Sequence, residues 1–308
     1  MSTFIPSHAR TFYIALRALN VSLSIIPDTT SSPTIGLMRL QFWRDAVTKI
    51  LAGTPPKEPV AILLASAISE LSQHTNGRAR ISKGWLNRLI NAREQTLTND
   101  PYPNIAALES YAENTYSTLI LAYWKGCWYR CRPAWITAGC IPPAPSQAPS
   151  GSTGSIGLNA GGRQGAVMLP LDIMAQAGVK EEEVLRRGAN AEGLRDAVFT
   201  VATRANDHLI TVDQMLSNLK AGEDVGHEFE HEGEEGHEYD CVDLAGGSRE
   251  SPLEEMNRAF GVFMPAVSTR LWLDRLQQHD FDVFQPELLR SDWKLPWKAY
   301  MAYRRKAI

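Results

Sequence analysis

The residues most suggestive of chemistry form a tract of histidines and glutamates in the last third of the chain. Residues 227–231 read HEFEH, which fits the H-E-x-x-H pattern of zinc proteases, and His237 falls where an extended pattern places a third ligand. That chemistry needs both histidines on one face of a buried helix, with the glutamate as general base. Four glycines interrupt the tract, however, and Glu234 stands where the extended pattern requires glycine. We therefore reject His227, His231 and His237 as zinc ligands and predict a solvated loop, because a tract of His, Glu and Gly matches such patterns by chance.

The cysteines suggest neither a metal site nor a disulfide framework. Cys127, Cys131 and Cys140 form a C-x3-C-x8-C pattern with no histidine nearby, and Cys241 lies alone. Structural zinc sites use closer, paired spacing. The sequence therefore predicts cysteines without a metal, in a reducing compartment.

The elements that must position any site are helices, because apolar residues repeat at helical spacing through most of the chain. In the most regular stretch, which begins at Pro33, the expected inward-facing stripe consists of Ile35, Met38, Phe42, Ala46 and Ile50. A glycine and a Pro-Pro pair then end this helix. The next helix, from about Pro59, would complete a helical hairpin, with inward residues Ile62, Leu63, Ala67 and Ile68.

The same periodicity predicts helices along the rest of the chain. They cover residues 8–24, 83–98, 105–123, 180–187, 193–219, 252–278 (with a kink at Pro265) and 294–304. No alternating strand pattern competes with them. We therefore predict an all-α fold in one domain of residues 1–308.

Two segments interrupt this predicted domain. Residues 124–166 are dominated by Gly, Pro, Ser and Ala from Gly139 onward, which predicts disorder or an aberrant insert such as retained intron sequence. Residues 221–250 form an acidic low-complexity loop, in which residues 222–240 hold nine carboxylates and no Lys or Arg. Both segments are expected to stand outside the helical core.

The charge and hydropathy of the sequence limit which kinds of partner, such as membranes or nucleic acids, are expected. Outside residues 222–240 the chain has 31 basic and 25 acidic residues, a net charge of about +6. A mildly basic body suits peripheral contact with an anionic membrane surface, although ordinary solubilising charge is the simpler explanation. No run of 18 uncharged apolar residues predicts a spanning helix, and the N-terminus shows neither a signal-peptide core nor a clear transit peptide. We expect no nucleic-acid partner.

Several strings together resemble the squalene/phytoene synthase family. They are Arg-Leu-x-Phe-Trp-Arg at residues 39–44, Gly-x-Pro-Pro at 53–56 and Pro-Val-Ala at 59–61, and residues 13–20 (YIALRALN) fit the family's first core helix. The resemblance covers residues 10–122 and 167–305. It implies the isoprenoid synthase fold, a helical bundle around a central cavity, and a native N-terminus that extends beyond residue 1.

The family's enzymes join two prenyl diphosphates and hold Mg²⁺ with carboxylates from two Asp-rich helices. By resemblance, the first acidic motif should follow the helix of residues 13–20, where only Asp28 is acidic, and the second should lie in residues 124–166, which contain no Asp or Glu. Glu109 and Glu113 form a lone i, i+4 pair that we expect to face solvent. Prenyl transfer is therefore not expected, and we predict no cofactor. The alternative is an active prenyl-diphosphate synthase whose Mg²⁺-binding helix is hidden by a faulty gene model.

The resemblance also nominates residues that would line the cavity. They are Arg17, Asn20, Arg39, Trp43 and Arg44, which could bind an anionic or lipid-like ligand. The simpler alternative is that the tryptophan belongs to the core and the arginines make surface pairs.

The string IGLMRLQFW at residues 35–43 is similar to one branch of the family, whose members serve in the assembly of mitochondrial respiratory complex I. This resemblance implies a non-catalytic protein on the matrix side of the inner membrane. Its partners would be complex I subunits or other assembly factors. A metalloprotease at His227 and His231 is the remaining alternative.

Overall fold

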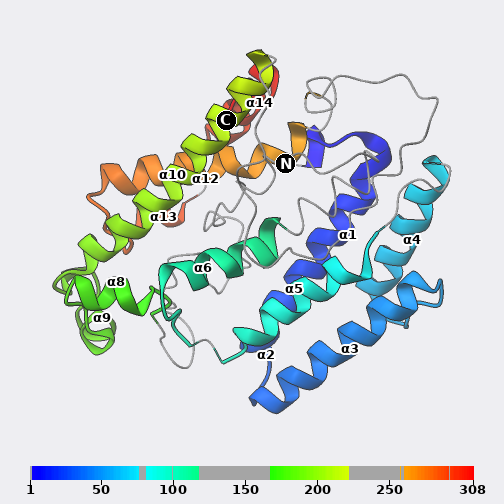
Figure 1. Ribbon diagram of the computed structural model, residues 1–308, viewed down its shortest axis with the longest axis horizontal. Helices are drawn as coiled ribbons and strands as arrows, with labels where there is room; N and C mark the ends of the chain where they lie inside the picture. Colours follow the sequence, from blue (N-terminus) through cyan, green and yellow to red (C-terminus); the bar gives the residue numbers. More distant parts are fainter. Residues whose placement is uncertain are drawn as a thin grey trace.

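The computed structural model describes residues 2–75, 81–98, 100–117, 167–221, 257, 260–290 and 292–308 (Figure 1). Every element in these ranges is helical, which confirms the predicted all-α fold. The predicted disordered section at 124–166 lies outside the described residues, as does the acidic loop except for Ala221. Within the described ranges no helix has the length and apolar character needed to cross a membrane.

The first part of the chain packs five helices around one core. After a short 3-10 turn, η1 (Ser2–Phe4), they are α1 (Ser7–Ser24), α2 (Ile26–Thr29), α3 (Pro33–Leu51), α4 (Pro59–His74) and α5 (Lys83–Gln95). The predicted hairpin is confirmed, since α3 and α4 pack together and both lie in the same core cluster. Polar side chains begin these helices: the Glu58 carboxylate accepts from the Ala61 amide at 2.6 Å, and the Ser82 hydroxyl accepts from the Gly84 amide at 3.2 Å.

The helix α6 (Ile105–Ala112) lies between the two parts of the molecule in Figure 1. The Asn104 side chain begins it by accepting from the Ala107 amide at 2.8 Å. The helix then widens into one π-helical turn, η2 (Glu113–Ser117). Such turns are rare and often occur beside functional residues, because the extra residue per turn redirects side chains.

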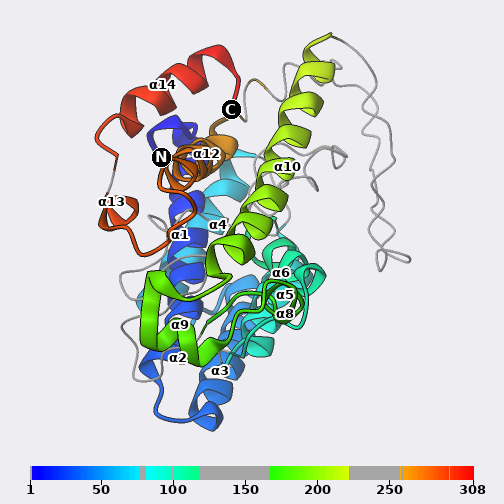
Figure 2. The same ribbon diagram turned by 90° about the vertical axis from the view of Figure 1, so that its left-hand side faces the viewer.

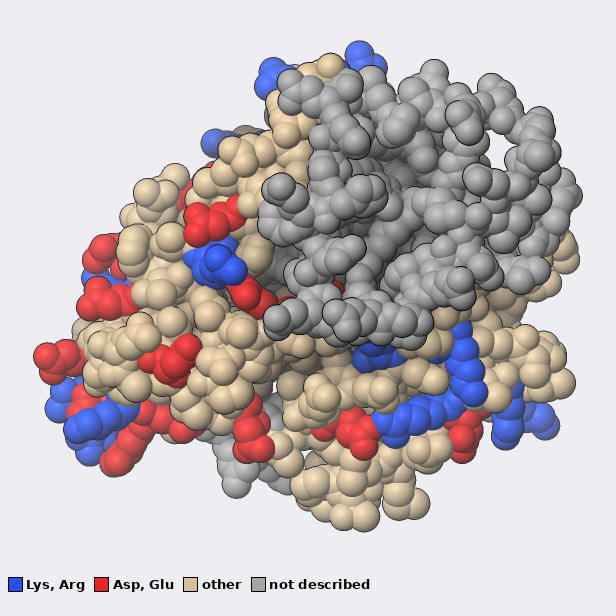
Figure 3. Space-filling model, in the orientation of Figure 1, with Lys and Arg blue, Asp and Glu red and all other residues tan. Residues whose placement is uncertain are grey.

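The second part of the chain contains the longest helix of the described residues. Its elements are α8 (Leu171–Gln176), α9 (Glu181–Arg187), η5 (Gly188–Asn190), α10 (Leu194–Ala221), η6 (Phe260–Phe263), α12 (Met264–Gln278), α13 (Pro286–Leu289) and α14 (Leu295–Arg305). Figure 2 shows α14 across one end of the molecule, with α12 beneath it. Figure 3 shows acidic and basic side chains interspersed over the described part of one face, rather than gathered by sign.

A glycine joins the two ends of the chain. A Cβ at Gly261, in η6, would lie 2.2 Å from the Phe4 carbonyl oxygen, so only glycine fits this contact. The neighbouring Val262 belongs to the core cluster of the first part of the chain. The N-terminal turn and the C-terminal helices are therefore one packed unit.

The predicted inward stripe of α3 is wrong for three of its five residues. Ile35, Met38 and Phe42 are 41%, 68% and 42% exposed, whereas Ala46 and Ile50 are buried as predicted. The face turned to the core instead consists of Gly36, Leu40, Trp43, Ala46, Val47 and Ile50. The physical reason is Gly36, whose missing side chain lets Leu97 approach the helix.

The inward face expected of α4 is wrong only for Ile62, which is 50% exposed. Ala67 is buried as predicted, Leu63 and Ile68 are partly buried against the core cluster, and Ala61, Leu64 and Leu71 are buried as well. Small residues again mark the buried side, because they allow close helix packing. The predicted kink at Pro265 is also wrong, since α12 begins at Met264 and the proline occupies its first turn. Proline is favoured there because its missing amide has no helical partner to lose.

Candidate functional site

Arg93, on α5, reaches into the space between α1 and α6. Its Nη2 donates a hydrogen bond to the Asn20 side-chain oxygen at 3.0 Å, and its Nη1 donates to the Tyr111 hydroxyl. The guanidinium also lies 5.4 Å from the centre of the Tyr111 ring. One arginine thus joins three helices through two hydrogen bonds and a cation–π contact.

Tyrosines complete this group. The Tyr102 and Tyr111 rings lie 5.5 Å apart, and Tyr116 follows in the π-helical turn. Burial raises the pKa of Tyr102 and of Tyr116, and the nearby Arg93 only partly opposes that effect. These phenols therefore stay protonated at physiological pH and present neutral hydroxyls. We refer to Asn20, Arg93, Tyr102, Tyr111 and Tyr116 as the Arg93 cluster.

The Arg93 cluster is cationic. Among the described residues, Arg93 donates to neutral oxygens, and its buried Nε has no hydrogen-bond partner. A second cation lies nearby, because Arg17 of α1 acts on the pKa of Tyr116 and of Tyr13, in each case against the larger raising effect of burial. A guanidinium among neutral phenols favours an anionic group and disfavours a metal cation beside it.

Among the described residues, this end of α1 offers no pair of carboxylates for Mg²⁺. By resemblance the first metal-binding carboxylates should follow the helix at Asn20, yet the Asn20 oxygen is already used by a guanidinium. Asp28 lies in the short α2 and is exposed to solvent. The ranges that the structure describes contain no group of three or more His, Cys, Asp or Glu side chains placed to bind a metal.

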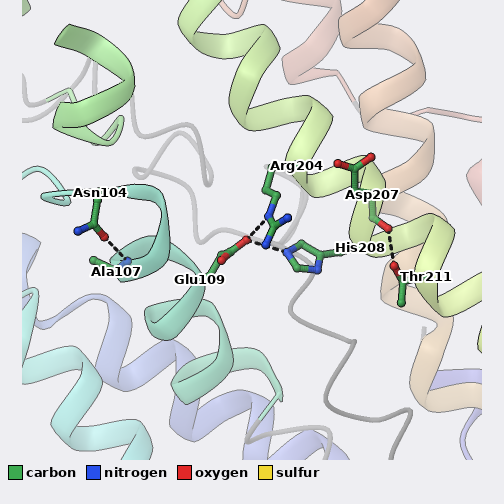
Figure 4. A network of polar contacts seen from close by, with 7 residues as sticks. All are labelled: Asn104, Ala107, Glu109, Arg204, Asp207, His208 and Thr211. Carbon is green, nitrogen blue, oxygen red and sulfur yellow. Dashed lines mark hydrogen bonds and ion pairs between the residues drawn. The ribbon is translucent and has the colours of Figure 1, made fainter. Parts of the chain in front are cut away.

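The opposite side of α6 carries a second set of polar contacts, shown in Figure 4. Glu109 accepts a hydrogen bond from Arg204 Nε at 2.5 Å, and the same oxygen lies 3.0 Å from His208 Nε2. Both partners come from α10. Burial alone would raise the pKa of the Glu109 carboxyl, but Arg204 and His208 outweigh burial and lower it. We refer to Glu109, Arg204 and His208 as the Glu109 network.

Glu109 was expected to face solvent, and this expectation is wrong. Its side chain is 27% exposed and ties α6 to α10. The error arises because the partners are 95 and 99 residues further along the chain, so no local spacing reveals them. Arg93 escaped prediction for the same reason, since Asn20 is 73 residues away from it.

The five residues predicted to line a cavity separate into two groups. Arg17 and Asn20 lie at the Arg93 cluster. The three residues of α3 lie elsewhere: Trp43 is 6% exposed within the core, Arg39 is exposed and donates to the Thr29 hydroxyl at 2.9 Å, and Arg44 forms an ion pair with Glu94. The HEFEH tract and all four cysteines lie outside the described residues.

The amino-acid sequence was compared with the profiles of known protein families, and one all-α family matches. The sequence profile of the squalene/phytoene synthase family matches residues 1–125 and 156–300. The internal gap in this match, residues 126–155, falls inside the segment that was predicted to interrupt the domain.

Three relatives illustrate the similarity. "NADH dehydrogenase (ubiquinone) complex I, assembly factor 6" of Bos taurus is 32% identical over 305 residues, which cover 99% of this chain and 77% of the relative. The Homo sapiens protein of that name is 30% identical with the same coverage. The Drosophila melanogaster homolog is 32% identical over 302 residues, covering 96% of this chain and 77% of its own. The chain therefore belongs to the squalene/phytoene synthase family.

Proposed function

We propose that this protein is a non-catalytic member of its family that acts in the assembly of mitochondrial respiratory complex I. The relatives named complex I assembly factor 6 match almost the whole chain, at 30–32% identity for the bovine and human proteins. A match of this extent supports a shared role and not only a shared fold. Through this role the protein belongs to mitochondria, on the matrix side of the inner membrane, and contacts that membrane peripherally.

The observation that carries the non-catalytic part of the proposal is the hydrogen bond between Asn20 and Arg93. A prenyl synthase needs carboxylates and Mg²⁺ at this position to neutralise a leaving diphosphate. A guanidinium there supplies positive charge directly, but it cannot act as a metal bridge that orients and ionises the diphosphate. The Arg93 cluster is therefore suited to recognise an anion rather than to transform one.

The proposed partners are complex I subunits or other assembly factors, and neither a cofactor nor a nucleic acid enters the proposed function. The described part of the face in Figure 3 offers both signs of charge for such contacts. Binding energy in protein interfaces depends on a few buried side chains rather than on net charge.

The assembly role is tested by deleting the gene and measuring the rotenone-sensitive oxidation of NADH in isolated mitochondria. We expect a severe loss of complex I activity, while complex II, which serves as the control, stays normal. Re-expression of the full chain should restore complex I. Normal complex I in the deletion strain would contradict the proposal.

The absence of catalysis is tested separately with the purified full chain. Incubation with Mg²⁺ and radiolabelled farnesyl or geranylgeranyl diphosphate should release no diphosphate above the protein-free blank. Steady turnover with either substrate would restore the prenyl-synthase alternative, whatever the deletion strain shows.

A further inference from the structure

The C-terminal helix exposes three large aromatic side chains. Trp293, just before α14, is 83% exposed, and Trp297 and Tyr300 are 66% and 45% exposed. These are large apolar areas to leave in water, because aromatic side chains contribute more than most to burial energy. Scattered single apolar residues on a surface need no explanation, but a cluster of aromatic residues does.

The helix is firmly seated, so this exposure is not the result of a detached end. On its opposite side Ala299 is 2% exposed. Leu295, Ala302 and Tyr303 pack against the cluster formed by α10, η6 and α12. The packing fixes which side of α14 faces outward.

Three of the exposed residues lie on one face of α14. Trp297, Tyr300 and Arg304 follow one another at intervals of three and four residues, which is the repeat of a single helix face, and Trp293 lies in the turn just before the helix. The Trp297 and Tyr300 rings lie 6.0 Å apart, and the Lys294 amine lies 5.4 Å from the centre of the Trp293 ring. We call this surface, together with the flanking Lys298 and Arg305, the α14 face.

The charge of the α14 face has one sign. From Trp293 to Ile308 the sequence contains five Lys or Arg residues and no Asp or Glu. Lys306 turns inward, with its amine 3.6 Å from the centre of the Tyr303 ring, and burial lowers its pKa. The remaining four, Lys294, Lys298, Arg304 and Arg305, are exposed.

This combination selects one kind of partner. Tryptophan and tyrosine prefer the boundary between lipid headgroups and acyl chains, where an apolar ring and a polar tip are both satisfied. Lysine and arginine beside them reach lipid phosphates while their stems cover apolar surface. Protein interfaces share the enrichment in aromatic residues and arginine but are depleted in lysine, so the exposed lysines Lys294 and Lys298 favour a lipid surface over a protein groove.

We propose that the α14 face docks on an anionic lipid bilayer, with Trp293, Trp297 and Tyr300 entering the interfacial layer and the four exposed cations contacting phosphates. The proposal gives a surface to the peripheral membrane contact named under the proposed function. It rests on that function only for the identity of the membrane, because binding to lipid vesicles is measured without complex I.

The test is co-sedimentation of the full chain with vesicles of phosphatidylcholine alone, or of phosphatidylcholine with 30 mol% (about one lipid in three) phosphatidylglycerol. We expect binding to the anionic vesicles, weakening as salt is raised. The double variant that carries Trp293→Ala and Trp297→Ala should bind the anionic vesicles about fivefold to tenfold more weakly than the wild type. Lys298→Glu with Arg305→Glu should weaken this binding about tenfold or more.

Two control pairs show whether the effect belongs to this face. Met38→Ala with Ile62→Ala removes exposed apolar side chains elsewhere, and Lys83→Glu with Lys180→Glu makes the same charge change elsewhere. Both pairs should bind vesicles like the wild type. Thermal melts followed by circular dichroism identify any double variant that fails to fold. If one of the two α14 double variants does not fold, the other one tests whether the α14 face binds vesicles.

Three outcomes would overturn the proposal. If the wild-type chain binds neither kind of vesicle, the α14 face does not bind lipid, and a partner protein must cover it instead. Self-association that is abolished by the tryptophan pair, without vesicle binding, assigns the face to a second copy of this chain. Vesicle binding that both α14 pairs leave unchanged places the membrane contact elsewhere. None of these outcomes bears on complex I activity in the deletion strain, so the two proposals can fail separately.

Discussion

The two sides of α6 meet their neighbours with different electrostatics. Toward α1 and α5, Arg93 is held by neutral oxygens and an aromatic ring. Toward α10, Glu109 is held by a guanidinium and an imidazole. One side thus keeps an uncompensated charge among the described residues, and the other pairs opposite charges. The first arrangement should resist changes of pH, and the second should respond to them.

Replacing Arg93 tests the neutral side and should give the largest effect. Arg93→Met keeps most of the apolar stem but leaves the Asn20 oxygen and the Tyr111 hydroxyl without their donor. We expect a loss of about 3 kcal/mol in the free energy of unfolding. Urea denaturation measures it, with Arg88→Met on the same helix as the matched control. Equal stability of the two variants would show that α5 does not depend on this contact.

Removing one hydroxyl from the same side should have a smaller effect. Tyr111→Phe keeps the ring beneath the guanidinium but removes one acceptor, which should cost about 1 to 2 kcal/mol. Tyr300→Phe, on the exposed α14 face, is the control and should leave the melting temperature unchanged. If both variants melt like the wild type, the hydrogen bond to Tyr111 contributes nothing measurable.

Asn20→Asp would make the neutral side resemble the charged one. The new carboxylate would face Arg93, so its folded pKa should fall below its unfolded value. Stability from such a group is present above the unfolded pKa and is lost as pH falls through the folded one. We therefore expect the difference in unfolding free energy between pH 7 and pH 3 to grow by about 1 kcal/mol relative to wild type. An unchanged pH profile would mean that the cost of burying the new carboxylate cancels its attraction to Arg93, because Asn20 is 5% exposed.

Glu109→Gln removes the pH response of the charged side and should have the smallest effect, because Arg204 is 51% exposed. The pKa of Glu109 is lowered in the folded chain. Its contribution is thus present above the unfolded pKa and is lost on acidification. At pH 7 we expect a loss of about 0.5 to 1 kcal/mol, which should shrink as the pH falls below the unfolded pKa. Glu70→Gln, at an exposed position of α4, is the control, and a loss that does not shrink on acidification would point to packing instead.

The sequence predicted the helices better than it predicted the faces that they bury. Proline at the first turn and Asn or Ser at the cap mark helix starts locally, so Pro33, Pro59 and Asn104 stand where the sequence places them. Which face is buried depends on neighbours distant in sequence. Large apolar residues suggested Ile35, Met38 and Phe42, but the small Gly36 allows the closest approach and so decides the packing.

The site was predictable only at its α1 end. Asn20 and Arg17 were recognisable because the first core helix resembles the family at those residues. Arg93, Tyr111 and the Glu109 network lie on helices whose own periodicity only separates apolar from polar sides. Residues that are 73 to 99 positions apart show no regular spacing in a single sequence, so their contacts could not be predicted from it.

The close approach of Gly261 to Phe4 has a consequence for how the chain is made. The two residues are 257 positions apart, and Val262 completes the core cluster of the first helices. During synthesis, or during passage through a membrane in an extended state, α1 to α5 are present long before this closing contact can form. Joining such distant segments costs loop-closure entropy and slows folding. The N-terminal helices should therefore lack this contact until the segment from Phe260 onward is available.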